Sequence, residues 1–358
     1  MTLHLGISER CRGLADAVIG WGLLGVIAVS PAAARPQEVR TADTDRWAVV
    51  SAPGTLVRDQ GAASVKHIST SWYHVVFDNS VSDCVSVATP GNPGGGLPPK
   101  GQVTAGFGNL EITVHTDDST GNKVDFGFHL LVLCPSGSRS AATRSEGPRS
   151  ESPPEMRTTT TDRWAVVNKD GTLVRGAGVA SLARLGTGAY EVIFNKNVSQ
   201  CVYVAAIGLA VTGIVPPAGE IGVAARGNNQ NGVYIRTRNS DGASADRPFH
   251  LFVGCEAVRG GSSGVWAAVK EGGTLALGSG VVSSARLGEG AYEVIFDRNV
   301  RSCVYIATLA RDRQNFGYPV GEISTAPRGN NTNGVYIRTW FTSGEKYDRS
   351  FHLYVGCA

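Results

Sequence analysis

The chain has 358 residues, with 33 Lys and Arg against 30 Asp and Glu, so its formal net charge is only +3. The basic residues are dispersed among acidic ones, as on an ordinary solvated surface, and they form no cluster of the kind that binds nucleic acid. We therefore expect no nucleic acid among the partners of this protein.

The first 34 residues are typical of an export signal. Arg10 and Arg12 supply its positive end, Leu14–Val29 its apolar run, and Ala32–Ala34 a small-residue cleavage site. We predict cleavage after about Ala34, followed by a short extension over 35–44, which leaves a secreted or surface-displayed protein without a membrane span. The alternative is an uncleaved anchor, although the apolar run falls short of the roughly 20 residues that a transmembrane helix needs.

A unit of about 90 residues then occurs three times, which fixes the domain count. Arg-Trp-Ala-Val-Val opens the first two copies at Arg46 and Arg163, and Val-Trp-Ala-Ala-Val opens the third at Val265. The predicted domains are residues 45–135, 162–255 and 264–358, and they are joined by a disordered linker over 136–161 and a short linker over 256–263. We expect repeats two and three to dock on each other and repeat one to swing freely on its long tether.

Each repeat consists of short β-branched and aromatic segments that alternate in polarity and are separated by turn residues. This pattern predicts an all-β protein of three tandem β-sandwich domains, jelly-roll-like as the first choice and immunoglobulin-like as the second. The immunoglobulin topology is second because the shared Trp precedes both cysteines. In the last strand, Phe351, Leu353, Val355 and Cys357 share one face and should point into the core.

Six cysteines follow the signal, two in each repeat, which predicts one internal disulfide per domain. The expected bridges are Cys84–Cys134, Cys201–Cys255 and Cys303–Cys357. Closing a loop of about 50 residues should stabilise each domain by roughly 4 kcal/mol. No Cys-x-x-Cys pair occurs, so we expect neither a metal site nor a cofactor.

Two surface features of repeats two and three are the candidate binding residues. One is an Asn-rich hairpin loop, and the other is a Tyr/Arg stripe on the following strand, where Val233, Ile235 and Thr237 should point inward. The candidates are Asn229, Asn231, Tyr234 and Arg236 in repeat two, and Asn331, Asn333, Tyr336 and Arg338 in repeat three. The alternatives are a plain turn and a solvated strand face. Repeat one has Thr113 and His115 at the stripe positions, so a shared site would be confined to the other two repeats.

The sequence contains one candidate catalytic pair, an Asp followed four residues later by a His in every repeat. The histidines are His129, His250 and His352. No Ser, Cys or Glu recurs where it would complete a nucleophile-base-orienter set, so we expect structural histidines and assign no catalytic residue. Glu220 and Glu322 also recur, but Gln102 replaces them in repeat one, and paired-carboxylate glycosidase chemistry is therefore unsupported.

The segments Asp162–Val167, Gly188–Phe194 and Phe249–Cys255 resemble repeats of uncharacterised exported tandem β-repeat proteins from high-GC bacteria. The β-rich unit with its Tyr-x-Val-x-Phe strand is also similar in architecture to the globular heads of phage tail fibres and of complement-type trimers. These resemblances imply a fold, and they carry no established activity with them.

The expected function is a non-enzymatic binding module, secreted or surface-displayed, that recognises a cell-surface glycan or protein. One alternative is a hydrolase-like enzyme that uses the Asp and His of the last strand. The other is a structural protein of the cell envelope without a discrete ligand.

Overall fold

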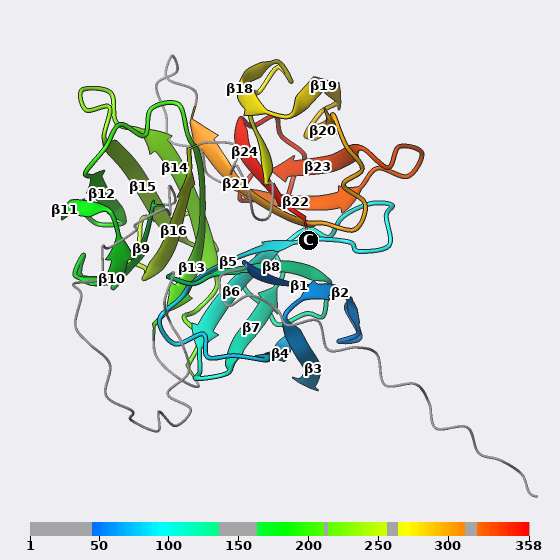
Figure 1. Ribbon diagram of the computed structural model, residues 1–358, viewed down its shortest axis with the longest axis horizontal. Helices are drawn as coiled ribbons and strands as arrows, with labels where there is room; N and C mark the ends of the chain where they lie inside the picture. Colours follow the sequence, from blue (N-terminus) through cyan, green and yellow to red (C-terminus); the bar gives the residue numbers. More distant parts are fainter. Residues whose placement is uncertain (1–44, 136–162, 211–213, 256–263, 312–320, 358) are drawn as a thin grey trace, which may run out of the picture. The chain divides into compact units, whose positions relative to one another are not determined.

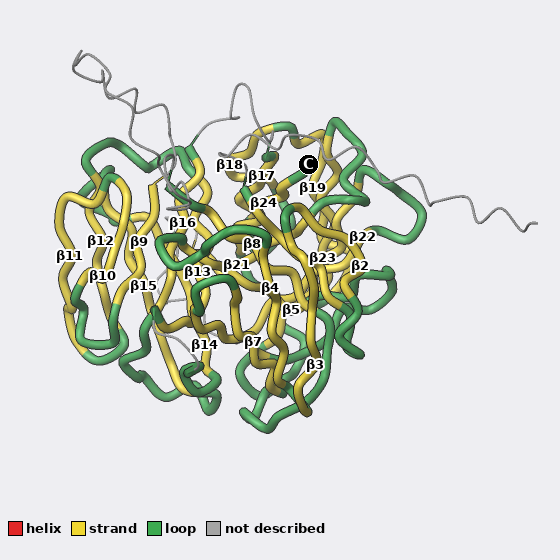
Figure 2. Tube along the Cα trace, turned by 60° about the horizontal axis from the view of Figure 1, so that its bottom comes forward, coloured by secondary structure: helices red, strands yellow, loops and turns green. Residues whose placement is uncertain are grey.

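The computed structural model describes residues 45–135, 163–210, 214–255, 264–311 and 321–357. Every regular element in these ranges is a β-strand, as Figures 1 and 2 show, which confirms the all-β prediction. The predicted export signal and both linkers lie outside the described residues. Within the described ranges there is no helix that is long and apolar enough to cross a membrane.

Each repeat contributes eight strands. Repeat one has β1 Arg46–Val50, β2 Leu56–Gln60, β3 Ala62–Ser69, β4 Trp72–Phe77, β5 Val85–Pro90, β6 Gln102–Phe107, β7 Glu111–Asp117 and β8 Phe128–Leu133. Repeat two has β9 Arg163–Val167, β10 Leu173–Ala177, β11 Val179–Gly186, β12 Ala189–Phe194, β13 Val202–Leu209, β14 Gly219–Ala225, β15 Gly232–Asn239 and β16 Phe249–Gly254. Repeat three has β17 Val265–Val269, β18 Leu275–Ser279, β19 Val281–Gly288, β20 Ala291–Phe296, β21 Val304–Arg311, β22 Glu322–Pro327, β23 Gly334–Trp340 and β24 Phe351–Gly356.

In every repeat the eight strands form a sandwich of two antiparallel sheets. In repeat one the orders are β2-β1-β8-β5 and β3-β4-β7-β6, and the other repeats have the same two orders. The first strand therefore pairs with the last, and the fourth pairs with the seventh. This pairing of early with late strands closes each two-layer sandwich.

The inner faces of the two sheets form a separate core in each repeat. The alternating pattern of the stripe strand is confirmed, because Val233, Ile235 and Thr237 are fully buried. Phe351, Leu353 and Val355 of the last strand are also fully buried, as predicted. The local periodicity of the sequence thus identifies which side chains line the interior of each sandwich.

Three disulfides join the predicted partners. Each bridge links a cysteine just before the fifth strand of a repeat to one just after its eighth strand, and these two strands are neighbours in one sheet. The Cα–Cα distances are 4.2 Å, 4.1 Å and 4.4 Å in repeats one to three. Structural disulfides of this kind are typical of proteins in an oxidising, extracellular environment.

Hydrogen-bonded strands continue from one repeat into the next. β13 of repeat two pairs in parallel with β6 of repeat one, beside which it lies in Figure 1. β14 of repeat two pairs in the same way with β21 of repeat three. Gly91 of repeat one and Thr325 of repeat three form an isolated parallel bridge at the third junction. Each repeat therefore contacts both others through equivalent strands.

The expectation that repeat one swings freely is therefore wrong. It rested on the composition of the linker over 136–161, which carries no information about the surfaces of the domains that it joins. Repeat one is held by β-pairing and by buried contacts, since the Oγ1 of Thr89 donates to the carbonyl of Ala307 in repeat three at 3.1 Å.

A fourth hydrophobic core lies between the repeats and draws on all three. Its members come from the outer face of the sheet that contains the last strand. The last strand itself is buried along its whole length in every repeat. The fully or nearly buried members are Trp47, Val49, Val85, Val87, Leu131, Leu133, Trp164, Val166, Val202, Val204, Ala206, Phe252, Trp266, Val304, Ile306 and Tyr354. The last strand of each repeat is therefore buried on both faces, and the three sandwiches share this fourth core in addition to their own.

Candidate functional site

The three shared histidines lie at the junctions between repeats and point across them. The Nδ1 of His129 in repeat one accepts a hydrogen bond from the backbone N–H of Tyr305 in repeat three, at 2.9 Å. His352 of repeat three accepts in the same way from Tyr203 of repeat two, at 2.8 Å. At the third junction, the Nδ1 of His250 in repeat two lies 2.8 Å from the carbonyl oxygen of Ser86 in repeat one.

Burial keeps these imidazoles neutral. Desolvation lowers the pKa of His250 to about 3 and that of His352 to about 4, and it moves the pKa of His129 well below its usual value. A neutral imidazole that accepts at Nδ1 carries its proton on Nε2, so His129 and His352 are fixed in one tautomer by the partner repeat. These residues join the repeats; His129 and His250 are fully buried, whereas His352 is 9% exposed.

The aspartates of the shared motif hydrogen-bond elsewhere. The carboxylate of Asp246 accepts from Arg184, from the backbone N–H of Gly188 and from the hydroxyl of Tyr190, and the bonds to Arg184 lower its pKa. Asp125 and Asp348 make equivalent contacts to the tyrosine of their own repeat. Asp246 thus hydrogen-bonds within its own repeat, whereas His250 contacts a neighbouring repeat. This geometry counts against the hydrolase alternative.

Two junctions are closed by an arginine from the second strand of a repeat. Arg175 of repeat two donates its Nε to the carbonyl of Cys84 at 2.9 Å, and its guanidinium lies 4.5 Å from the ring centroid of Phe107. Arg58 of repeat one donates to the carbonyl of Cys303 at 3.1 Å and lies over the ring of Tyr305. In both cases the side chain fills the space between two sandwiches.

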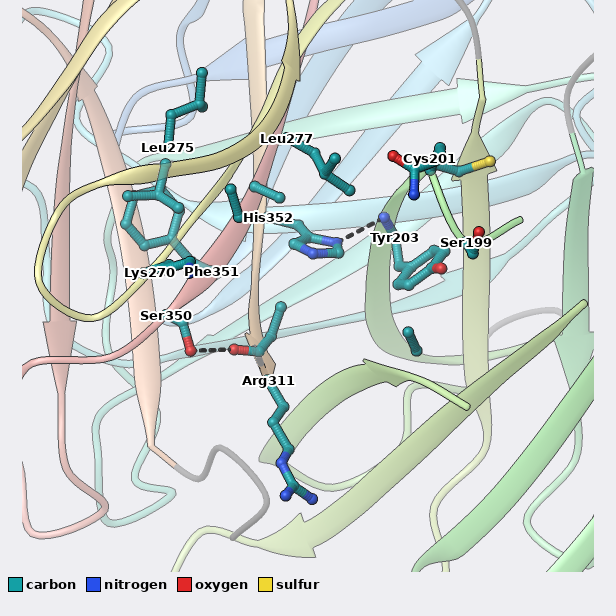
Figure 3. Close-up of a pocket in the computed structure, with 16 residues that line it drawn as sticks. Ser199, Cys201, Tyr203, Lys270, Leu275, Leu277, Arg311, Ser350, Phe351 and His352 are labelled. Atoms are coloured by element: carbon teal, nitrogen blue, oxygen red, sulfur yellow. Dashed lines mark hydrogen bonds between the residues drawn. The ribbon is translucent and has the colours of Figure 1, made fainter. Parts of the chain in front are cut away.

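We call an arginine that fills a junction in this way the plug. Repeat three carries Leu277 at the position of these arginines, so the junction between repeats two and three lacks the plug. At the same junction Ala225 occupies the place that Phe107 has in repeat one. A pocket of about 280 Å³ opens here, lined by both residues and by His352 and Tyr203. Figure 3 shows Leu275, Leu277 and Phe351 on one side of it, with Cys201, Tyr203 and Ser199 opposite.

The pocket continues into a second hollow of about 320 Å³, with which it shares Ser199, Ala225 and Arg311. Asn229 and Tyr234, two of the predicted binding residues, line this second hollow. We call the two hollows together the 2/3 cleft. Its inner end has apolar walls, and its outer end carries amide, hydroxyl and cationic groups.

The other predicted site residues lie around and beyond this cleft. The side chains of Asn229 and Asn331 accept the backbone N–H of Asn231 and Asn333 at 2.9 Å, so all four asparagines take part in the hairpin turns themselves. Tyr234 is only 7% exposed, because Arg226, which is paired with Glu191, lies over its ring.

Arg236 is half-buried on the same outer face as Tyr234. In repeat three Arg338 donates to the hydroxyl of Tyr336 at 3.2 Å and lies over the ring of Trp340. The structure therefore brings Asn229 and Tyr234 to the 2/3 cleft, and it places the repeat-three stripe on a separate surface.

The residues that open the cleft were missed by sequence reasoning. The signal was present, because the second strands read Leu-Val-Arg in repeats one and two and Leu-Ala-Leu in repeat three. The meaning of the missing arginine becomes visible only once its contacts across the junction are known.

Removing the plug from another junction should create a second cleft. We expect Arg175→Leu to lower the free energy of unfolding by about 2 kcal/mol, because it deletes a charge-assisted hydrogen bond and a cation–π contact. Urea unfolding measures this change, with Lys196→Leu as a control at an exposed site in the same repeat. An equal stability of both variants would show that the arginine adds nothing to the junction.

Glu220, Glu322 and Gln102 occupy equivalent positions and line one small cavity of about 50 Å³ that all three repeats enclose. Glu322 and Gln102 each accept a hydrogen bond from a neighbouring repeat, from Ser119 at 2.9 Å and from Ser240 at 2.8 Å. Burial raises the pKa of Glu322 to about 7. The two glutamates line the same cavity, which a search for neighbouring acids in the sequence could not find, but the cavity is too small for a glycoside.

Within the described ranges, no group of three or more His, Cys, Asp or Glu residues is placed to hold a metal ion. No family model, curated protein or solved structure matches the chain, so the geometry of the junctions is the basis for a functional assignment.

Proposed function

We propose that this protein is a non-enzymatic binding protein and that its ligand, a glycan, enters the 2/3 cleft. The observation that supports this most directly is the loss of the arginine plug at one junction out of three. A packed core loses stability when a side chain is removed and the space stays open. Leu277 and Ala225 together leave such a space where Arg175 and Phe107 fill it at the neighbouring junction.

The chemistry of the cleft supports binding of a sugar-like molecule. Its apolar wall of Leu275 and Leu277 suits the C–H face of a pyranose ring. The amides of Asn229 and Gln230 line its outer end and offer hydrogen-bonding groups for ring hydroxyls.

The same chemistry does not favour catalysis. The hydroxyl of Ser350 donates to the carbonyl of Ala310 at 2.6 Å, and His352 accepts a backbone N–H. No described residue of the cleft lining combines a nucleophile with a base. A secreted or surface-displayed location, with the export signal removed after about Ala34, is part of the proposal and agrees with the disulfides.

Restoring the plug tests the proposal. We expect Leu277→Arg to donate to the carbonyl of Cys201, as Arg58 does to that of Cys303, and to fill the cleft. Binding to a panel of immobilised bacterial and host oligosaccharides, measured by fluorescence of the labelled protein, should fall at least about tenfold, which corresponds to about 1.4 kcal/mol. Ala225→Phe should have the same effect by blocking the cleft from the opposite wall.

Leu287→Arg is the matched control, since it adds the same charge at a 46% exposed leucine of the same repeat. It should leave the binding profile unchanged. Retained binding by a folded Leu277→Arg protein, judged by a melting temperature no lower than that of the wild type, would rule out the cleft as the site.

A further inference from the structure

We propose that Glu220 and Glu322 form a pH-sensitive latch, a buried contact that holds the repeats together while one of the two carboxyls is protonated and loosens when both are ionised. The two side chains come from repeats two and three and line one cavity that all three repeats enclose. The latch acts on the packing between the repeats and does not involve the ligand of the 2/3 cleft.

Each repeat contributes one polar side chain to this cavity from the start of an equivalent strand. These side chains are Gln102 of β6, Glu220 of β14 and Glu322 of β22, and none of them is more than 4% exposed. Buried polar groups in folded proteins are almost always hydrogen-bonded. The repeats therefore have to pack in an arrangement that supplies hydrogen bonds to all three side chains.

The hydrogen bonds of both carboxyls cross the junctions. The hydroxyl of Ser119 and the amide of Gln102, both in repeat one, donate to Glu322 of repeat three at 2.9 Å and 3.4 Å. Glu220 of repeat two accepts the backbone N–H of Gly321 in repeat three at 2.9 Å. Because these contacts join different repeats, the protonation of the two carboxyls bears directly on how tightly the repeats pack.

The surrounding charges differ between the two carboxyls. Glu220 faces two guanidinium groups, those of Arg238 in its own repeat and Arg349 in repeat three, and both favour its ionised form. Glu322 faces one cation, Lys100 of repeat one, and also the negative charge of Glu220. When only one of the two carboxyls is ionised, it is therefore Glu220, and Glu322 holds the proton.

Burial raises the pKa of both carboxyls. For Glu220, the hydrogen bonds from Thr342 and Gly321 and the two guanidinium groups oppose this effect. For Glu322, burial and the charge of Glu220 raise the pKa from 4.5 to about 7, in spite of its hydrogen bonds. Loss of the proton near neutral pH then places two negative charges at one buried cavity, which weakens the packing around it.

Replacing Glu322 by glutamine should keep the latch closed at every pH, because Gln102 already supplies an uncharged amide at the equivalent position of repeat one. In the folded chain Glu322 holds a proton that it releases on unfolding. We therefore expect the unfolding equilibrium constant of the wild-type chain, relative to that of Glu322→Gln, to rise about tenfold per pH unit between about pH 4.5 and about pH 7 and to level off above that. Urea unfolding of both full chains at a series of pH values measures this ratio.

Glu220→Gln distinguishes a coupled pair from two independent buried acids. It removes the like charge that faces Glu322 and keeps the shape of the side chain. In the Glu220→Gln background, the effect of Glu322→Gln should therefore level off at a lower pH than in the wild-type background. Glu345→Gln, at an exposed glutamate of repeat three, is the matched control and should not change the pH dependence.

Hydrogen exchange detects the loosening itself and does not require the unfolding of any variant. β14, which carries Glu220, pairs in parallel with β21 across the junction between repeats two and three. At pH 8 we expect the amides of both strands to exchange faster in the wild-type chain than in Glu220→Gln or Glu322→Gln, and at pH 5 we expect equal rates.

An unfolding ratio that does not change with pH would overturn the latch, because Glu322 would then have the same pKa in the folded and unfolded chains. Equal exchange at pH 8 would show that ionisation does not loosen the junction. If Glu220→Gln leaves the pH dependence of Glu322 as it is in the wild type, the two carboxyls are independent and do not form a latch. The proposed function does not depend on any of these outcomes.

Discussion

The contribution of His352 to stability should disappear as the pH falls from about 6.5 to about 4, because its imidazole is buried without charge at the junction between repeats. Desolvation lowers its pKa in the folded chain to about 4, against about 6.5 when the chain is unfolded. Between these values the unfolded chain binds one more proton than the folded chain. The stability is thus fully present above pH 6.5 and is lost by about 1.4 kcal/mol for every unit of pH below it, or roughly 3 kcal/mol in all.

His250 and His129 change the stability with pH in the same direction as His352, since burial also lowers the pKa of each. Buried carboxyls change the stability with pH in the opposite direction, and Glu220, Glu322 and Asp117 are of this kind. Burial raises the pKa of Glu322 to about 7 and that of Asp117 to about 6, so these groups make the folded chain less stable as the pH rises through that range. The pH profile of the wild-type protein alone therefore mixes opposing contributions.

The difference in stability between the wild-type protein and a variant without His352 isolates the contribution of this histidine. His352→Asn cannot titrate, and its Oδ1 can still accept the N–H of Tyr203 in place of Nδ1. We expect the wild-type advantage over His352→Asn, measured by urea unfolding at a series of pH values, to shrink by about 1.4 kcal/mol per unit between pH 6.5 and pH 4. Since Glu322 and Asp117 are present in both proteins, their contributions cancel.

His352→Phe supplies the second comparison. It also cannot titrate, and it leaves the N–H of Tyr203 without its acceptor, so it should be less stable than His352→Asn by about 1–3 kcal/mol at every pH. The slopes of the two variants against pH should agree. A wild-type advantage that stays constant from pH 6.5 to pH 4 would mean that His352 is charged in the folded protein.

The fold inside each repeat could be predicted from the sequence because its determinants are local. Alternation along Phe351–Gly356 identifies the inner face of the last strand, and the spacing of Cys303 and Cys357 identifies their bridge. Both features are written into single segments and then repeated, so they can be read without knowing how the repeats pack.

The packing between repeats could not be predicted in this way, although the sequence of the last strands does contain an indication of it. The outward positions of the last strands are Leu131, Phe252 and Tyr354, which are large and apolar where a solvated face would carry polar side chains. A strand with apolar residues on both faces is typical of a sheet that is buried on both sides. The shared histidine interrupted this pattern and concealed it.

The candidate site was only partly predictable for a related reason. Asn229 and Tyr234 were selected for their residue types, and the structure places both at the 2/3 cleft. The cleft itself exists because Leu277 does not fill the junction as an arginine would, and the absence of a contact leaves no recognisable pattern in the local sequence. The differences between the repeats indicate function only after their common contacts have been worked out.

Phe252→Ala should destabilise all three repeats at once. Phe252 is fully buried in the central core, and its ring makes an edge contact with Tyr354 of repeat three at a centroid distance of 5.2 Å. Loss of a buried phenylalanine leaves a cavity and costs about 3–5 kcal/mol. Because the central core belongs to every repeat, we expect scanning calorimetry to show one cooperative transition that moves to lower temperature as a whole.

Phe296→Ala distinguishes a shared core from three independent ones. Phe296 is equally buried, but it belongs to the core of repeat three alone. If the repeats unfold together, both alanine variants shift the same single transition, and Val282→Ala, at a 66% exposed position, leaves it in place within about 0.5 kcal/mol. Separate transitions, of which Phe296→Ala moves only one, would contradict a common interior. A single transition means instead that the 2/3 cleft is held by the stability of the whole chain, so a ligand bound there raises the unfolding temperature of every repeat, including repeat one, which does not touch it.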